Sequence, residues 1–341
     1  MSETARRFPR AYRERSWVLP AARPDSASRP CVVHLVRAAN GEEPFRAFVQ
    51  ALRNHPPGTD FDLVLAMKGF HGRGDARPYL DFAADLSPEA LFFPDEGLDL
   101  GVYFGAAAAL RRDRYCFLNS YSEPLVAGWL EKLDAALGEP GVGLAGATGS
   151  WASTRSWTAH VLRLPSAYRG VLPEPRLAME QFMAMELDRM GMEPAAAQRS
   201  ALATTRARIE TLAEIPRQTL PYERFPAYHI RTNAFMVTHA TLAELHLRPV
   251  REKHEAYLLE NGRSSITRQV QRKGLRTLVV DRKGDVYDRE QWPASRTFWQ
   301  GDQEGLLVRD NQTRCYADAD ADRRRLLSGF AWGREADPTR P

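Results

Sequence analysis

Short apolar segments alternate with helical patterns along the first half of the chain, and this alternation constrains the fold most. Residues 31–38 (CVVHLVRA) form an apolar run typical of a buried strand, and residues 42–54 follow with apolar side chains at helical spacing. The alternation continues, with strands expected at 61–70, 90–94, 114–119 and 141–150 and helices at 102–112 and 122–137. Strands separated by helices indicate an α/β fold with a mostly parallel sheet and helices on both faces.

The rest of the chain divides around this pattern. Residues 1–30 combine several prolines with many arginines and predict a flexible basic arm. Residues 173–220, rich in Met, Ala, Glu and Arg, predict a helical insertion, after which strand character returns at 228–238. We therefore expect an α/β domain over 31–290 and a C-terminal extension, 291–341, that packs on it.

Composition narrows the class of protein. The chain has 341 residues, 43% of them hydrophobic, which is enough for one large domain or two small ones. Its three cysteines are far apart and show no C-x-x-C spacing, which favours a reducing cytoplasm. The N-terminus is charged, and the apolar run 100–110 is shorter than the ~20 residues of a spanning helix. We expect a cytoplasmic protein whose only membrane contact is peripheral, at the inner face, and we assign no oligomeric state.

Several literal motif matches lie in the wrong context. Residues 141–146 read G-x-G-x-x-G, but they follow a helix and form a strand, which argues against a dinucleotide site. Residues 68–74 contain glycines without the G-K-[ST] ending of a phosphate loop and predict a flexible connection. The D-x-D at 60–62 precedes a strand, and the one at 318–322 favours a helix start. None of these four segments predicts a site.

Five other segments carry a resemblance. They are PDEGLDLGVY (94–103), FLNSYSEPLVAGWLEKL (117–133), GLAGATGSW (143–151), HIRTNAFMV (229–237) and YLLENGRSSITRQVQRKGLRTLVVD (257–281). Together they resemble GT-A-type glycosyltransferases, and are similar to family 2 and rhamnan-synthesis-type proteins of bacterial surface polysaccharide pathways. The resemblance implies a nucleotide-binding half followed by an acceptor-binding half. It also implies transfer of a sugar from a nucleotide-sugar donor to a polysaccharide, lipid-linked or protein acceptor.

The chain departs from this family at the metal-binding motif. GT-A enzymes usually place a D-x-D pair after a central strand to hold a divalent metal, Mn or Mg, against the donor diphosphate. Here the place is taken by Asn119 and Ser120, with Glu123 the only anionic side chain nearby. The resemblance assigns Asn119 and Ser120 to donor binding and leaves Glu123 as a weak candidate metal ligand. The sequence therefore leaves two alternatives, donor binding with a divalent metal and donor binding without one.

Two further carboxylates follow the expected strand at 90–94. Asp95 and Asp99 lie at its carboxyl end, where open α/β sheets bind ligands. The resemblance makes them candidates to bond the donor nucleotide or to replace metal ligands. The alternative is that they shape a turn and cap the next helix.

Glu260 is the candidate general base. The segment LLENGRSSITRQ resembles the acidic pair and helix of family 2 enzymes, with Glu260 in the acidic place and Asn261 in the second. Such a base accepts the proton of the acceptor hydroxyl as it attacks the anomeric carbon. Glu255 is an alternative base, and an exposed turn residue is the alternative role for Glu260.

The remaining candidates lie in the acceptor half. The resemblance places Arg231 and Asn233 near donor sugar or acceptor, and Arg268 at the diphosphate. Trp151 is a candidate for stacking on a sugar ring, although tryptophans more often pack in cores. Either arginine has the alternative of pairing with a structural carboxylate.

Three functions compete. The first is a glycosyltransferase, and the second is a non-catalytic relative that binds a nucleotide, a glycan or a partner protein. Nucleic-acid binding is suggested only by the arginine-rich tails and a pI of about 9.0, and we expect no nucleic-acid partner.

Overall fold

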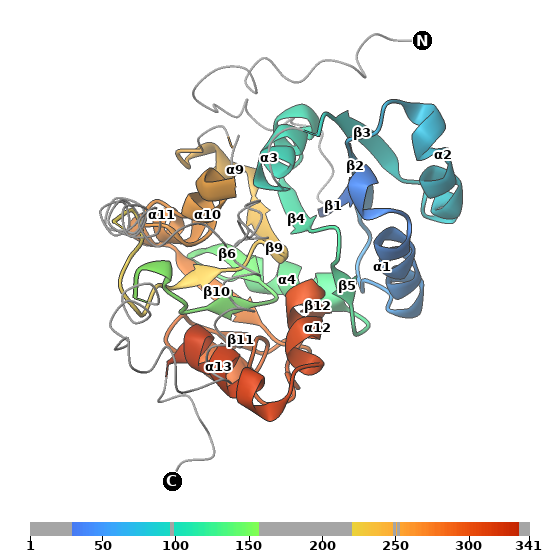
Figure 1. Ribbon diagram of the computed structural model, residues 1–341. Helices are drawn as coiled ribbons and strands as arrows, with labels where there is room; N and C mark the ends of the chain where they lie inside the picture. The colour runs from blue at the N-terminus through green and yellow to red at the C-terminus, as the bar shows by residue number, and fades with distance from the viewer. Residues whose placement is uncertain (1–28, 96–98, 157–219, 248–249, 251–252, 334–341) are drawn as a thin grey trace, which may run out of the picture.

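The computed structural model describes residues 29–95, 99–156, 220–247, 250 and 253–333. Its centre is an eight-stranded sheet with the order β11-β10-β6-β9-β4-β1-β2-β3 (Figure 1). The strands are β1 (Cys31–Arg37), β2 (Asp62–Lys68), β3 (Glu89–Phe93), β4 (Arg114–Leu118), β6 (Val142–Gly146), β9 (Ala234–Thr238), β10 (Arg276–Val280) and β11 (Val286–Tyr287). Only β9 and β11 pair antiparallel to their neighbours, so the predicted mostly parallel sheet is confirmed.

The central strands are apolar on both faces. In β1, Val33 and Leu35 belong to one hydrophobic core, while Val32 and Val36 belong to a second core on the other face. All four side chains are at most 2% exposed. A strand buried on both sides needs a helical layer on each face, which is what the unbroken apolar runs of the sequence indicate.

Helices supply both layers. The helices are α1 (Glu43–Asn54), α2 (Arg73–Phe82), α3 (Asp99–Leu110), α4 (Trp129–Leu137), α9 (His239–Ala243), α10 (Lys253–Asn261), α11 (Ile266–Arg272), α12 (Asn311–Ala317) and α13 (Ala321–Trp332). Apolar residues of α1, α2 and α4 pack in one core, and those of α3, α9, α10, α11 and α13 pack in the other. The prediction of helices on both faces is confirmed.

Two local predictions are wrong. The helix expected at 122–137 begins only at Trp129, since Pro124 lies in the short strand β5 (Glu123–Pro124) and Gly128 precedes the helix with φ 72°. The connection expected at 68–74 is shorter than predicted, because α2 begins at Arg73. The helix start expected near 318–322 is confirmed, because the Asp320 side chain accepts from the backbone N of Arg323 at the start of α13.

The described part of the C-terminal segment lies against the domain. Strand β12 (Val308–Arg309) pairs antiparallel with β5, and the backbone N of Trp151 donates to the carbonyl of Ala331 over 3.0 Å. A second two-stranded sheet joins β7 (Gly149–Ser150) to β8 (His229–Ile230). The expected arm, 1–30, and the expected insertion, 173–220, lie outside the described residues apart from 29, 30 and 220.

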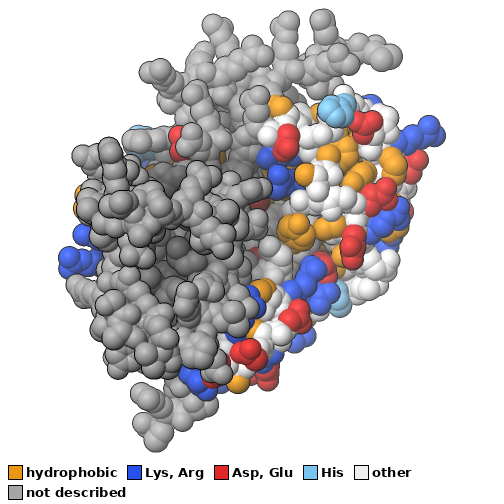
Figure 2. Space-filling view, in the orientation of Figure 1, with side chains coloured by type: hydrophobic (Ala, Val, Ile, Leu, Met, Phe, Trp, Pro, Cys, Tyr) orange, Lys and Arg blue, Asp and Glu red, His pale blue; other side chains and the backbone are white. Residues whose placement is uncertain are grey.

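Two further features concern helix length and surface charge. In the described ranges no helix combines the length and the apolar character needed to cross a membrane. On the described part of the face in Figure 2, acidic and basic side chains lie interspersed.

Candidate functional site

A topological switch lies between β1 and β4. From β1 the chain continues outward to β2 and β3, whereas β4 lies on the other side of β1. Open α/β sheets bind ligands outside the carboxyl ends of the strands at such a point. The loops that follow the two strands meet there, because Asn40 donates from Nδ2 to Ser120 Oγ over 2.8 Å. This hydrogen bond marks the centre of the candidate site.

Two cations end the neighbouring strands β1 and β2. Arg37 and Lys68 are the last residues of these strands and are partners in the parallel register. Asp95, just beyond β3, places Oδ1 3.5 Å from Lys68 Nζ and 3.8 Å from Arg37 Nη2. Lys68 is 2% exposed and Asp95 is 59% exposed, so the carboxylate is open to solvent and the ammonium group is not.

Asp99, the first residue of α3, adds a second carboxylate. Burial raises the pKa of Asp99, while Arg37 and Lys68 oppose this increase and Glu260 adds to it. Burial likewise lowers the pKa of Lys68, with Arg37 acting in the same direction and the two aspartates opposing it. Arg37, Lys68, Asp95 and Asp99 therefore form one electrostatic unit, which we call the charge cluster.

Glu260 reaches the same region from the last turn of α10. Its Oε1 accepts a hydrogen bond from the backbone N of Thr232 over 3.2 Å. Burial raises the pKa of Tyr103, and Asp99 and Glu260 add to the increase, which places this phenol near both carboxylates. Within the described ranges the Tyr103 hydroxyl is buried without a hydrogen-bond partner. Glu260 is partly buried in a helix, so its alternative as an exposed turn residue is wrong.

Asn119 and Asn233 fix the loop after β4. Asn119 Oδ1 accepts from the backbone N of Tyr121 over 3.0 Å and from Ser122 Oγ over 2.8 Å, which forms a side-chain turn. The backbone N of Asn119 donates to the carbonyl of Asn233 over 2.9 Å. Asn233 is 2% exposed and accepts from Thr148, but its Nδ2 has no partner among the residues described. Such a buried donor is commonly completed by water or ligand.

Glu123 is held by two arginines of the C-terminal segment. Arg309 donates to Glu123 Oε2 from Nε over 2.9 Å and from Nη2 over 2.5 Å. Arg314 Nη2 donates to Oε1 of the same carboxylate and to the carbonyl of Tyr121. We call Glu123, Arg309 and Arg314 the arginine clamp.

The donor set after β4 does not fit a divalent metal. Hard cations take several carboxylate, carbonyl or water oxygens at once. Here Asn119 Oδ1 and both Glu123 oxygens already accept hydrogen bonds from their own neighbours. No cluster of three His, Cys, Asp or Glu side chains arranged for a metal is found in the part of the chain that the structure describes. We therefore do not carry Glu123 forward as a metal ligand.

Arg231 and Arg268 pair with carboxylates of the fold. Arg231 is 7% exposed and donates from Nη2 to Asp310 Oδ2 over 2.7 Å. Arg268 donates from Nε and Nη2 to Glu223 Oε1 over 3.1 and 2.9 Å. For both arginines the structure therefore shows the alternative of a structural carboxylate.

Trp151 packs in an aromatic group. Its Nε1 donates to the carbonyl of Arg289 over 2.9 Å, and its ring makes edge contacts with Tyr228 and Trp332. Most of the contacts of Trp151 are therefore those of a tryptophan packed in a core, which is the alternative to stacking on a sugar ring. It remains partly buried next to β7.

Sequence reasoning missed Arg37, Lys68, Tyr103 and Asn40. A usable signal existed for the first two, because each is a basic residue ending an apolar strand run. Tyr103 lies inside an apolar helix and offers no comparable signal.

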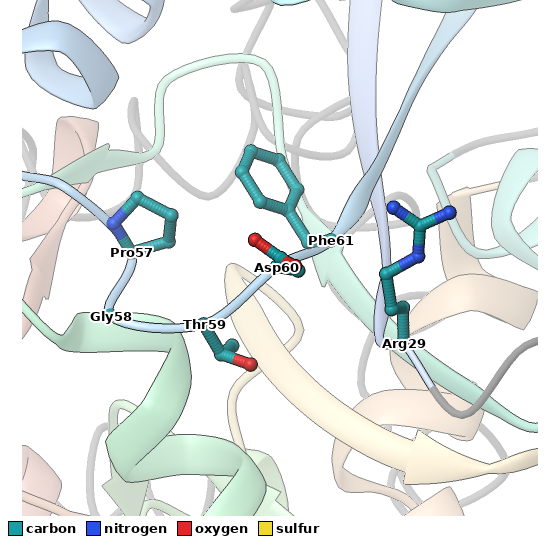
Figure 3. A pocket seen from close by; sticks show the side chains of 6 residues that line it. All are labelled: Arg29, Pro57, Gly58, Thr59, Asp60 and Phe61. Carbon is teal, nitrogen blue, oxygen red and sulfur yellow. The ribbon is translucent and has the colours of Figure 1, made fainter.

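A shallow cavity of about 470 Å³ lies elsewhere (Figure 3). Arg29 and residues 57–61 line it, immediately before β1 and β2. It is therefore at the amino ends of the strands, opposite the charge cluster. We place the candidate site at the carboxyl ends, because the charge cluster, the unpartnered Tyr103 hydroxyl and the unpartnered Nδ2 of Asn233 lie there.

Comparisons with known proteins are limited to structures. No protein-family model matches the chain, and no curated protein matches it. The mannosyltransferase PcManGT from Pyrobaculum calidifontis, in complex with GDP-Man and Mn²⁺, is 14% identical with a TM-score of 0.28, and the match covers 46% of this chain and 44% of that one. The bifunctional glycosyltransferase WbbM, in an apo structure, is 12% identical with a TM-score of 0.34, covering 72% and 40%. The match spans less than half the length of both neighbours.

Proposed function

We propose that this chain is a GT-A-type glycosyltransferase that binds a nucleotide-sugar donor at the carboxyl ends of β1 to β4. One observation carries the proposal. The fold brings the charge cluster, the Asn40–Ser120 hydrogen bond and Glu260, which are far apart in the sequence, together at the topological switch point. The resemblance of the five sequence segments supports the same function.

The donor nucleotide meets the charge cluster in this proposal. Asp95 and Asp99 accept hydrogen bonds from ribose hydroxyls or the base, and Arg37 donates to acceptor atoms of the same nucleotide. Ser120 and the unpartnered Nδ2 of Asn233 bind the donor sugar in this proposal.

Glu260 acts as the general base. The acceptor hydroxyl oxygen forms a new bond to the anomeric carbon and passes its proton to the Glu260 carboxylate. The bond from that carbon to the β-phosphate oxygen breaks, and its electron pair stays on the departing nucleoside diphosphate. The backbone N of Thr232 holds Glu260 Oε1 and orients the carboxylate.

The acceptor class follows only from the resemblance. A polysaccharide, a lipid-linked glycan or a protein each fits a polysaccharide pathway, and a lipid-linked acceptor would bring the chain to the inner face of a membrane. We propose a cytoplasmic site of action on the same ground.

The first experiment is thermal unfolding against UDP, GDP, CDP, TDP and their sugar conjugates. A ligand at a hundred times its dissociation constant stabilises the folded state by about 2.7 kcal/mol, which raises the midpoint measurably. The nucleotide that gives a shift defines the donor for transfer assays. No shift with any nucleotide would reject the proposed function.

Glu260→Gln then tests the base. We expect transfer to fall by roughly 10² to 10⁴-fold with little change in donor-induced stabilisation, because the amide cannot accept the proton. Glu244→Gln, at an exposed carboxylate paired with Lys273, is the matched control. Full activity in the Glu260 variant with loss in Glu255→Gln would move the base to Glu255.

A non-catalytic relative is the second candidate. Asn119 in the place of a metal-binding carboxylate favours it, because its side chain serves a loop turn. Donor binding without turnover of any sugar conjugate would support this candidate over the transferase.

A further inference from the structure

We infer that the two guanidinium groups of the arginine clamp bind the donor diphosphate, so that the chain binds its donor without a divalent metal. The inference rests on the proposed function. It deepens that proposal by naming the groups that receive the leaving phosphates. It also explains why the segment after β4 lacks a metal-ligand set.

The two arginines of the clamp have N–H donors that are not used in the hydrogen bonds to Glu123 and Tyr121. A guanidinium carries five N–H donors. Arg309 directs only Nε and Nη2 to Glu123, and Arg314 directs only Nη2 to Glu123 and Tyr121. Arg314 Nε is buried and has no hydrogen-bond partner within the described part of the chain. Planar guanidinium groups with unused N–H donors suit phosphate oxygens, which they bind in pairs.

The exposure of the clamp also suits a ligand. Glu123 is 5% exposed, whereas the side chains of Arg309 and Arg314 are 46% and 38% exposed. The carboxylate therefore serves as a buried anchor, and the arginines extend from it toward solvent. An arrangement made only for stability would gain little from leaving both guanidinium groups half exposed.

The clamp and the charge cluster differ in net charge. The clamp has two guanidinium groups and one carboxylate, which gives it a surplus positive charge. The charge cluster has two cations and two carboxylates, with Glu260 close to them. A diphosphate gains negative charge as it leaves, and preorganised positive groups stabilise that charge. Of these two groups, the clamp is the one with surplus positive charge for the leaving diphosphate.

The C-terminal segment fixes these arginines to the loop after β4. Strand β12 contains Arg309 and pairs with β5, which contains Glu123. Arg314 lies one turn into α12, whose N-terminus is capped by Asp310. Ser120, in the same loop, is bonded to Asn40 at the end of β1. The clamp is thus part of the rigid frame around the switch point, which is the preorganisation that charge stabilisation requires.

The test is binding of UDP, GDP, CDP and TDP to the full chain by calorimetry, in EDTA and separately with manganese. We expect one nucleotide to bind in EDTA, with less than a twofold change on adding manganese. Arg309→Gln should weaken that binding by about tenfold or more, since it removes charged hydrogen bonds to phosphate. Arg276→Gln is the matched control, because Arg276 is 40% exposed and also binds carboxylates, Glu139 and Asp288.

Arg314→Lys guards against misfolding, because lysine keeps the charge beside Glu123 and loses the planar fork. We expect it to melt near the wild-type temperature and to bind the nucleotide several-fold more weakly. Binding that requires manganese, or that is equal in Arg309→Gln and the wild type, would overturn the inference and leave the proposed function standing. Absence of binding by all four nucleotides in both conditions would overturn the two together.

Discussion

Two arginine–carboxylate groups flank the loop after β4, and they differ in solvent exposure. The pair of Arg231 and Asp310 is sealed, with side chains 7% and 1% exposed, and the Arg231 guanidinium lies 4.1 Å over the Phe298 ring. The arginine clamp buries its carboxylate at 5% exposure but leaves Arg309 and Arg314 46% and 38% exposed. The same chemistry therefore serves two purposes. A sealed pair holds elements together, whereas an open group retains donors for a ligand.

The comparison also explains why Arg231 is a poor ligand residue. Its guanidinium is shared among Asp310, Gln312 and Thr148, and an aromatic ring covers it. A diphosphate would have to displace these partners and leave the buried Asp310 carboxylate without its compensating charge. The half-exposed arginines carry no such penalty.

The largest effect is expected from Asp310→Asn. Asparagine keeps the helix cap of α12 but removes the charge that compensates buried Arg231. We expect the free energy of unfolding to fall by about 3–5 kcal/mol, which is typical of an uncompensated buried charge. Denaturant unfolding measures it, with Glu304→Gln at the exposed pair with Arg296 as the control. A loss equal to that of the control would show that the pair is not sealed in solution.

Glu123→Gln should have a smaller effect. It removes the carboxylate of the clamp, but the two arginines it frees are already half exposed and can be hydrated. We expect a loss of about 1–2 kcal/mol, as for charged hydrogen bonds whose partners regain water. The same unfolding experiment, run beside Asp310→Asn, compares the two groups directly. Equal losses in the two variants would remove the distinction between them.

The fold was largely predictable from the sequence, because strands buried on both faces leave unbroken apolar runs. The runs at 31–38, 61–70 and 114–119 all became strands that pair parallel in the sheet, and α1 follows the apolar spacing of 42–54. The helix predicted at 122–137 is wrong in its first part, since Glu123 and Pro124 form a strand by pairing with Arg309 and Val308, far along the chain. A tertiary pairing of this kind leaves no local pattern.

The site was less predictable for a related physical reason. The sequence makes Asp95 and Asp99 candidates because they follow a strand and Ser120 a candidate through the resemblance, and the structure brings all three to one edge of the sheet. Where the role of a residue depends on a partner far along the chain, the local sequence does not distinguish that residue from its neighbours. The sequence makes Glu123 only a weak candidate metal ligand, and it cannot show the two arginines that contact this carboxylate, because they lie in the C-terminal segment.

His34 offers a third kind of buried polar group, one with no partner. It is 0% exposed, stacks on Phe48, and neither ring nitrogen has a hydrogen-bond partner among the described residues. Burial lowers the pKa of His34 from 6.5 to about 3. Between these values the unfolded chain binds a proton that the folded chain does not, so stability is full above pH 6.5 and falls as the pH decreases.

The expected slope from His34 is about 1.4 kcal/mol per pH unit between pH 6.5 and 4.5. Unfolding free energies of wild type and His34→Leu, measured across this range, isolate the contribution from that of the carboxylates. The variant should show a shallower decrease by that amount. Parallel curves would mean that His34 is protonated in the folded state.

The smallest effect is expected where both partners are open to water. Arg276 binds Glu139 and Asp288, and all three side chains are between 36% and 45% exposed. Arg276→Gln should lower the free energy of unfolding by no more than about 1 kcal/mol, and less in high salt, because exposed pairs are screened. Its guanidinium is as exposed as those of the clamp, but it faces two carboxylates instead of sharing one. If solvent exposure alone made an arginine a phosphate ligand, Arg276→Gln would weaken nucleotide binding as Arg309→Gln does. Unchanged nucleotide binding in the Arg276 variant would show that surplus positive charge is the deciding property.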